Sequence, residues 1–157
     1  MWDAEIDKRH AEGIPVKPGV REVVEEIRER DLPYMIATST PTERAHQVLA
    51  KAGLSDLFPK LIGGDQVASG KPAPDIYLAA ARLLEKVPAH CVAFEDSANG
   101  VKAAHAAGCR TIQIPDIVQP DPELLALGHH VAPDLMAGAK HLGLFVPDGP
   151  RPAESAS

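Results

Sequence analysis

Cysteine is scarce in this sequence, and basic residues are outnumbered by acidic ones. The 157 residues include two cysteines, Cys91 and Cys109, which lie in apolar runs without CxxC spacing. This pattern argues against a disulfide framework or a cysteine zinc site, and it favours a reducing, cytoplasmic setting. The formal net charge of -6 argues against a nucleic-acid surface, because such surfaces need basic patches to neutralise phosphates.

Long apolar segments are also absent. No apolar run approaches the roughly 18 residues that a membrane span needs, and the N-terminal residues are charged where a signal peptide would have an apolar core. The sequence therefore predicts no membrane contact. Hydrophobic residues make up 45% of the chain and charged residues 24%, as in ordinary globular proteins, and the length suits one domain.

Short apolar runs alternate with amphipathic segments along most of the chain. The apolar runs predict strands at residues 34–37, 60–63, 91–94 and 111–114. The segments between them predict helices at residues 20–30, 42–52, 75–86 and 98–107. Short continuous runs are typical of strands buried on both faces of a parallel sheet. The alternation predicts a Rossmann-like, three-layer α/β/α fold with a mostly parallel sheet.

The two ends of the chain differ from this centre. Residues 1–12 predict a short polar helix, residues 13–146 an α/β core, and residues 147–157, rich in Pro, Gly, Ser and Ala, a disordered tail. After residue 115 the pattern is weaker. It predicts one or two helical turns at residues 120–127, an edge strand at residues 130–131 and a last helix at residues 135–141.

Two adjacent carboxylates, Glu95 and Asp96, follow the apolar run at residues 91–94. Such a pair at the carboxyl edge of a parallel sheet, where α/β proteins bind ligands, suggests a magnesium site. Mg²⁺ prefers hard oxygen ligands and usually takes one or two carboxylates from the protein. The alternative is that Asp96 or Ser97 caps the helix that begins at Ala98. From the pair alone, both interpretations stay open.

A hydroxyl cluster, Thr38, Ser39 and Thr40, stands where a predicted strand turns into a predicted helix. Backbone N–H groups and the helix dipole favour a phosphate at such a turn. Thr40 fits a helix N-cap, because Pro41 and Glu43 follow it at the spacing of a capping box. Thr38 and Ser39 are therefore the candidate phosphate ligands.

Lys71 lies in the segment GKPAPD, where a glycine and two prolines restrict the backbone around one cation. A lysine held in this way can neutralise a transferring phosphoryl group and the carboxylate that attacks it. A solvated loop lysine is the alternative, and Lys71 taken alone does not decide between them.

The segments IATST at residues 36–40, GKPAPD at residues 70–75 and FEDSANG at residues 94–100 together resemble three motifs of the haloacid dehalogenase-like superfamily. They match the second, third and fourth motifs, in the right order. The most similar branch contains β-phosphoglucomutase and the sugar-phosphate phosphatases. The resemblance extends from about residue 13 to residue 142 and implies a phosphatase or phosphomutase that acts on a small phosphorylated metabolite.

The resemblance also implies a role for each candidate residue. Thr38 would hydrogen-bond the transferring phosphoryl group, with Ser39 helping through its backbone. Lys71 would balance the charge between the phosphate and the nucleophile. Asp96 would bind Mg²⁺ directly, with Glu95 beside it.

The first motif of that superfamily, Asp-x-Asp-Gly at the end of an apolar strand, is missing from this sequence. In the family its first aspartate is the nucleophile and its second is the general acid and base. Asp3 and Asp7 lie early in the chain, but neither an apolar strand nor a glycine accompanies them. Residues 1–12 resemble instead the last helix of the family's cap domain.

The resemblance places the missing strand in the middle of the sheet, between the strands that end at Thr38 and Glu95. These two strands could close up, or another chain could fill the gap by dimerisation or strand exchange. We expect instead an inactive fragment of a longer protein. The alternative is a non-catalytic phosphate-binding or assembly module that kept the fold and lost the chemistry.

Overall fold

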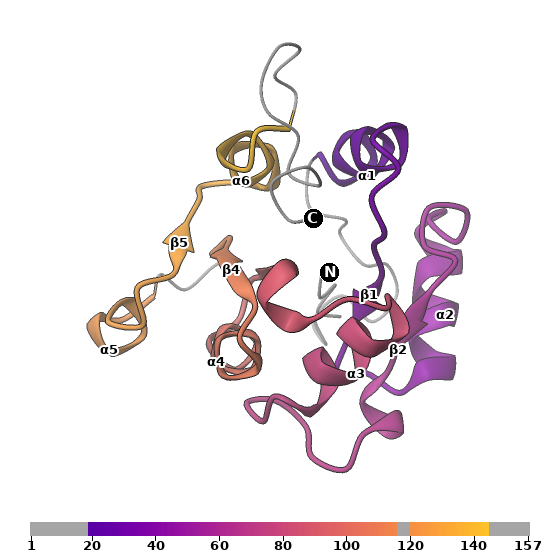
Figure 1. Cartoon of the computed structure of the whole chain (residues 1–157). Helices are drawn as coiled ribbons and strands as arrows, with labels where there is room; N and C mark the ends of the chain where they lie inside the picture. The colour runs from indigo at the N-terminus through magenta and orange to yellow at the C-terminus, as the bar shows by residue number, and fades with distance from the viewer. Residues whose placement is uncertain (1–18, 116–119, 145–157) are drawn as a thin grey trace.

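The predicted alternation of strands and helices is confirmed by the computed structural model, which describes residues 19–115 and 120–144 (Figure 1). The strands are β1 (Ile36–Ala37), β2 (Leu61–Ile62), β3 (Val92–Glu95), β4 (Arg110–Gln113) and β5 (His130–Val131). The helices are α1 (Val20–Glu29), α2 (Thr42–Lys51), α3 (Asp75–Leu83), α4 (Ala98–Ala107), α5 (Pro122–Leu125) and α6 (Leu135–His141). Two 3₁₀ turns, η2 (Gly64–Gln66) and η3 (Pro88–His90), connect them. None of the helices in these ranges is long and apolar enough to cross a membrane.

Several predicted boundaries differ from the structure by a few residues. The helix expected at residues 75–86 ends at Leu83, and Glu85 adopts a left-handed φ of 58° that cannot continue a helix. The helix predicted at residues 1–12 and the tail predicted at residues 147–157 lie outside the described residues. So do residues 13–18, 116–119 and 145–146 of the predicted core.

Among the described residues, the strands pair in two parallel groups. One contains β1 and β2, and the other has the order β3-β4-β5. The short strand β5 pairs with β4 at the end of this order, as predicted for an edge strand. Within the described residues, no ladder joins β1 to β3. Among residues 19–115 and 120–144, the sheet therefore has a break between these two strands.

Neighbouring residues on the strands point to opposite helix layers. Ile36 and Phe94 pack in one apolar cluster with α1 and α6, whereas Ala37 and Ala93 pack in a second cluster with α3 and α4. Figure 1 shows α1 and α6 together on one side of the strands and α3 and α4 on the other. This alternation gives the predicted three layers.

Backbone direction identifies the edges that border the break. Ile36 and Thr38 donate their N–H groups to carbonyls of the β2 segment. Because backbone groups alternate in direction along a strand, the N–H and C=O groups of Ala37 point to the opposite edge of β1. The carbonyl of Glu95 accepts a hydrogen bond from the β4 segment, so the N–H and C=O groups of its neighbour Phe94 point away from β4. Ala37 and Phe94 thus mark the two edges at the break.

An apolar cavity lies beside this break, on the side of α1 and α6. Met35, which precedes β1, and Phe94 of β3 both line it, together with Leu135 and the apolar face of α1. Residues of both strand groups and of one helix layer therefore line the same apolar cavity.

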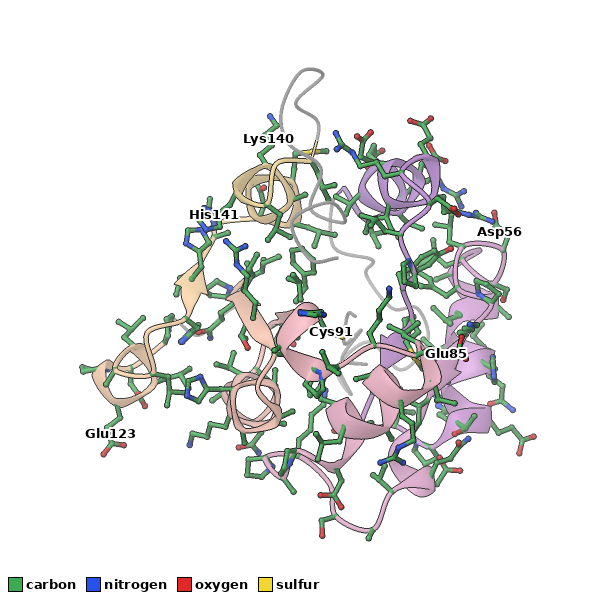
Figure 2. All side chains as sticks on the ribbon, in the orientation of Figure 1. Asp56, Glu85, Cys91, Glu123, Lys140 and His141 are labelled. Carbon is green, nitrogen blue, oxygen red and sulfur yellow. The ribbon has the colours of Figure 1, made fainter. Side chains whose placement is uncertain are left out.

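The cysteines are buried, as predicted. Cys91 and Cys109 are free thiols with 6% and 7% of their surface exposed, and burial raises the pKa of Cys109 to about 11. Figure 2 shows Cys91 in the interior, whereas Glu123 and Lys140 point outwards. Buried thiols with a raised pKa are poor nucleophiles, so these cysteines are structural.

Candidate active site

The predicted site residues Lys71 and Glu95 come together between the ends of β1 and β3. The Lys71 Nζ atom lies 2.8 Å from Oε2 of Glu95 and 3.4 Å from the carbonyl oxygen of Ala37. Ala37 is the last residue of β1 and Glu95 is the last residue of β3, so the Lys71 ammonium contacts both strand groups. Thr38 and Asp96, which follow these strand ends in the sequence, lie at the same edge.

Lys71 is not a solvated loop lysine. Its side chain is 4% exposed, and the peptide bond to Pro72 is cis. Burial lowers the pKa of Lys71 because the charged form is desolvated, while Glu95 and, more weakly, Asp96 oppose this effect. The structure therefore places the Lys71 amine inside the protein, and the two carboxylates beside it partly offset the effect of burial on its pKa.

Glu95 is buried as deeply as a core residue, with 1% of its surface exposed. Its Oε2 atom accepts hydrogen bonds from Lys71 and from the hydroxyl of Tyr77. Burial raises the pKa of Glu95 to about 7, although Lys71 and Tyr77 stabilise the ionised form. Its Oε1 atom is buried and has no hydrogen-bond partner within the described part of the chain.

The hydroxyl cluster is arranged differently from the prediction. We expected Thr40 to cap α2, and this is wrong: α2 begins at Thr42 without a cap from Thr40. Asp65 of η2 performs this function instead, since its Oδ1 accepts hydrogen bonds from the backbone N–H of Thr42 at 2.8 Å and from its hydroxyl. An acid 23 residues away in the sequence therefore satisfies the helix N-terminus.

Thr38 and Ser39 occupy the turn between β1 and α2. Thr38 is 1% exposed, and its Oγ1 accepts a hydrogen bond from the N–H of Thr40 at 3.2 Å. Ser39 is exposed, and Gly64 packs so closely beneath it that a Cβ at position 64 would lie 2.4 Å from the Ser39 carbonyl oxygen. Close packing against Gly64 thus restricts the backbone of this turn, while Ser39 is exposed to solvent.

Of the two residues that could cap α4, the structure selects Ser97. Ser97 is the N-cap, because its hydroxyl accepts a hydrogen bond from the N–H of Gly100 at 3.0 Å. Asp96 is partly buried, and its negative charge acts on the pKa of both Lys71 and Glu95. Asp96 therefore belongs electrostatically to the ion pair and not to the helix cap.

A sequence profile described as haloacid dehalogenase-like hydrolase matches residues 4–108. The chain belongs to this family. This confirms the resemblance found in the sequence motifs, and the three-layer parallel fold agrees with it.

Relatives within the haloacid dehalogenase-like hydrolases include named phosphatases. A phosphorylated carbohydrates phosphatase of Thermotoga maritima is 43% identical over 95 residues, which cover 60% of this chain and 44% of the relative. A crystal structure titled putative β-phosphoglucomutase, also from Thermotoga maritima, is 37% identical with a TM-score of 0.66 and covers 73% of this chain and 53% of that one.

A second solved structure is a haloacid dehalogenase family hydrolase from Deinococcus radiodurans R1 with bound phosphate and sodium. It is 31% identical to this chain with a TM-score of 0.72, and the match covers 83% of this chain and 61% of that one. This chain thus spans about half the length of the relatives it matches.

The haloacid dehalogenase-like family implies a bound Mg²⁺, and the donors at the strand end fit this ion in part. Glu95 and Asp96 supply hard carboxylate oxygens, and Oε1 of Glu95 is a buried acceptor without a hydrogen bond in the described ranges. Across residues 19–115 and 120–144, however, no three His, Cys, Asp or Glu side chains form a group that could hold a metal ion. The chain therefore offers a partial metal shell.

Two residues at this site were not identified from the sequence. Tyr77 lies in the helix predicted at residues 75–86 and Gly100 lies in the FEDSANG segment, and no role was predicted for either from the sequence. A tyrosine on the apolar face of a helix indicates a polar contact in the interior, because a buried hydroxyl needs a hydrogen-bond partner. A glycine in the first turn of a helix can indicate that another group packs closely against the helix backbone at that position.

Proposed function

We propose that this chain, joined to a strand that carries Asp-x-Asp-Gly, is a magnesium-dependent phosphatase or phosphomutase acting on a small phosphorylated metabolite. We favour a sugar phosphate, because one relative is named a phosphorylated carbohydrates phosphatase and another is titled a putative β-phosphoglucomutase. The observation that carries the proposal is the Lys71 ammonium between the ends of β1 and β3.

Each candidate residue has a role in this reaction. Thr38 hydrogen-bonds the transferring phosphoryl group, and the backbone of Ser39 is a second donor. Lys71 neutralises charge on the phosphoryl group and on the attacking carboxylate. Asp96, with Glu95 beside it, would hold Mg²⁺, which when bound supplies positive charge to the phosphate oxygens.

The nucleophile must come from a segment other than these 157 residues, since the sequence contains no Asp-x-Asp. The family resemblance assigns the attack to an aspartate whose carboxylate oxygen bonds to phosphorus as the ester P–O bond breaks. The second aspartate protonates the leaving oxygen, and water then cleaves the aspartyl phosphate. The chain alone has the stabilising residues without the attacking one, so we propose that it is inactive alone.

The break in the sheet supports the place proposed for the absent strand. The backbone edges at Ala37 and Phe94 have no ladder partner among the described residues. Unpaired buried backbone groups cost free energy, so these edges favour an added strand. The occupant we propose is a segment of a longer protein, and a second copy that dimerises or exchanges a strand is the alternative.

Phosphatase activity tests the proposal directly. The chain joined to a strand with Asp-x-Asp-Gly is expected to hydrolyse p-nitrophenyl phosphate or a member of a sugar-phosphate panel in the presence of Mg²⁺. The chain alone is expected to have no activity. Lys71→Met should abolish the activity of the joined protein, and Lys102→Met, on the exposed face of α4, should not. Failure of the joined protein on every substrate would overturn the proposal.

A non-catalytic phosphate-binding or assembly module is the second candidate function. The absence of Asp-x-Asp from the sequence favours it. The coding DNA upstream of residue 1 separates the two candidates: an in-frame Asp-x-Asp-Gly favours the enzyme, and a stop codon favours the module. For either function we propose a cytoplasmic location and no nucleic-acid or membrane partner, based on the cysteine content and net charge.

A further inference from the structure

Tyr77 is a fully buried tyrosine whose hydroxyl reaches the candidate active site. It lies in α3 with no exposed surface, and its hydroxyl donates a hydrogen bond to Oε2 of Glu95. Lys71 donates to the same oxygen, and the Lys71 Nζ atom lies 5.3 Å from the centre of the Tyr77 ring. One side chain thus contacts both members of the buried ion pair.

A role in core packing explains the ring of Tyr77 but not its hydroxyl. The ring packs in the apolar cluster that contains Met35 and Ala80. Phenylalanine would fill nearly the same volume without a polar atom. Because a buried hydroxyl costs free energy unless it is hydrogen-bonded, its position against a carboxylate needs a separate explanation.

The Glu95 carboxylate is confined from another side by Gly100. A Cβ at position 100 would lie 1.8 Å from Oε1 and 2.1 Å from the carboxyl carbon of Glu95. The carboxylate therefore occupies the space that the glycine leaves open. With Gly100 on one side and the two donors at Oε2, the carboxylate is held in one orientation.

We propose that Tyr77 is a positioning residue that acts through Glu95: its hydroxyl fixes Oε2, and Oε2 fixes the Lys71 ammonium between the ends of β1 and β3. This inference rests on the proposed function, in which Lys71 faces the transferring phosphoryl group. A charge that is already in place needs no reorganisation when the transition state forms, which is the basis of electrostatic catalysis. Tyr77 thus determines where the positive charge of the site lies.

A double-mutant cycle on the unfolding equilibrium of this chain tests the inference. Tyr77→Phe keeps the ring, so its contact with Lys71 remains, and any coupling to Lys71→Met must pass through the hydroxyl and Glu95. We expect a coupling of about tenfold in the unfolding equilibrium constant. With Glu95→Gln also present, we expect the coupling to fall to about twofold or less. A coupling that is absent in the first cycle, or equal in both, would overturn the inference.

Tyr34 provides a matched control. Its hydroxyl donates to the carbonyl of Leu57, and its ring lies in the other apolar cluster. Tyr34→Phe also removes one hydrogen-bonded hydroxyl, and we expect it to show no coupling to Lys71→Met. A coupling as large as that of Tyr77→Phe would mean that the cycle reports general destabilisation, which also overturns the inference.

A second measurement serves if Tyr77→Phe does not fold. The chain contains two tyrosines, so 3-fluorotyrosine incorporated into the Tyr34→Phe protein labels Tyr77 alone. The ¹⁹F chemical shift is expected to change with Glu95→Gln and to stay unchanged with Lys102→Met. A chemical shift that does not change with Glu95→Gln overturns the inference. None of these experiments uses a substrate, so an inactive joined protein would overturn the proposed function without deciding the role of Tyr77.

Discussion

The Lys71 ammonium lies 2.8 Å from Oε2 of Glu95, and the two side chains are 4% and 0% exposed. An ion pair this deeply buried loses the hydration of both charges, and burial is the largest influence on the pKa of each partner. Such a pair is weak support for folding stability on its own, although removing one partner alone is costly. Its position at two strand ends fits a functional role better than a stabilising one.

Lys71→Met should destabilise the chain by about 3 kcal/mol at a pH where Glu95 is ionised, because a buried carboxylate then loses its cation. Adding Glu95→Gln should recover part of this loss, since the uncompensated charge is gone. Urea unfolding of the single and double variants measures both effects. Lys102→Met is exposed on α4 and should change stability by less than about 0.5 kcal/mol. Equal effects of the two lysine substitutions would contradict the prediction.

The contribution of Glu95 to the stability of the chain should fall as pH rises from 4.5 to 7. Burial raises the pKa of Glu95 from 4.5 to about 7, so the folded state binds this proton more tightly than the unfolded state between those values. Stability decreases with rising pH wherever the folded state holds more protons. In metal-free buffer, Glu95→Gln should remove a decrease on the order of 2 kcal/mol. The same pH slope in both proteins would count against a raised Glu95 pKa.

The order of the elements could be predicted from the sequence because it depends on local periodicity. The helix at residues 98–107 and the edge strand at residues 130–131 have the predicted bounds. The cap of α2 could not be predicted in this way. Thr40 fits a capping box in the local sequence, but Asp65 of η2 accepts the hydrogen bond from the N–H of Thr42. A tertiary contact of this kind leaves no local pattern.

The candidate site was predictable as a set of residues but not as a network. Motif positions indicate Thr38, Lys71, Glu95 and Asp96, and their roles remain predictions. Nothing in the spacing indicates that Glu95 turns into the interior, because that depends on the hydroxyl of Tyr77 in α3 and on a small residue in α4. These conditions appear when the helices pack on the strands.

Gly100→Ala should destabilise the chain even though alanine favours helices. In an exposed helix this change stabilises by about 0.5–1 kcal/mol. Here the new Cβ would lie 1.8 Å from Oε1 of Glu95, so the carboxylate must leave its position. We expect a net loss of about 2 kcal/mol. In a Glu95→Ala background, where the clash is absent, Gly100→Ala should be neutral or stabilising. Thermal unfolding of the four proteins distinguishes this from a general intolerance of alanine at position 100.

The two strand edges at the break should exchange their amide hydrogens faster than the paired edges. Ile36 donates its N–H to the β2 segment, whereas the N–H groups of Ala37 and Phe94 point to the break, where the described residues provide no ladder partner. We expect Ala37 and Phe94 to exchange roughly tenfold faster than Ile36 in NMR-detected hydrogen exchange. Protection that increases with protein concentration would indicate a second copy in the break. Protection equal to that of Ile36 at every concentration would mean that these edges are already covered within one chain, which would contradict the proposed place for the added strand.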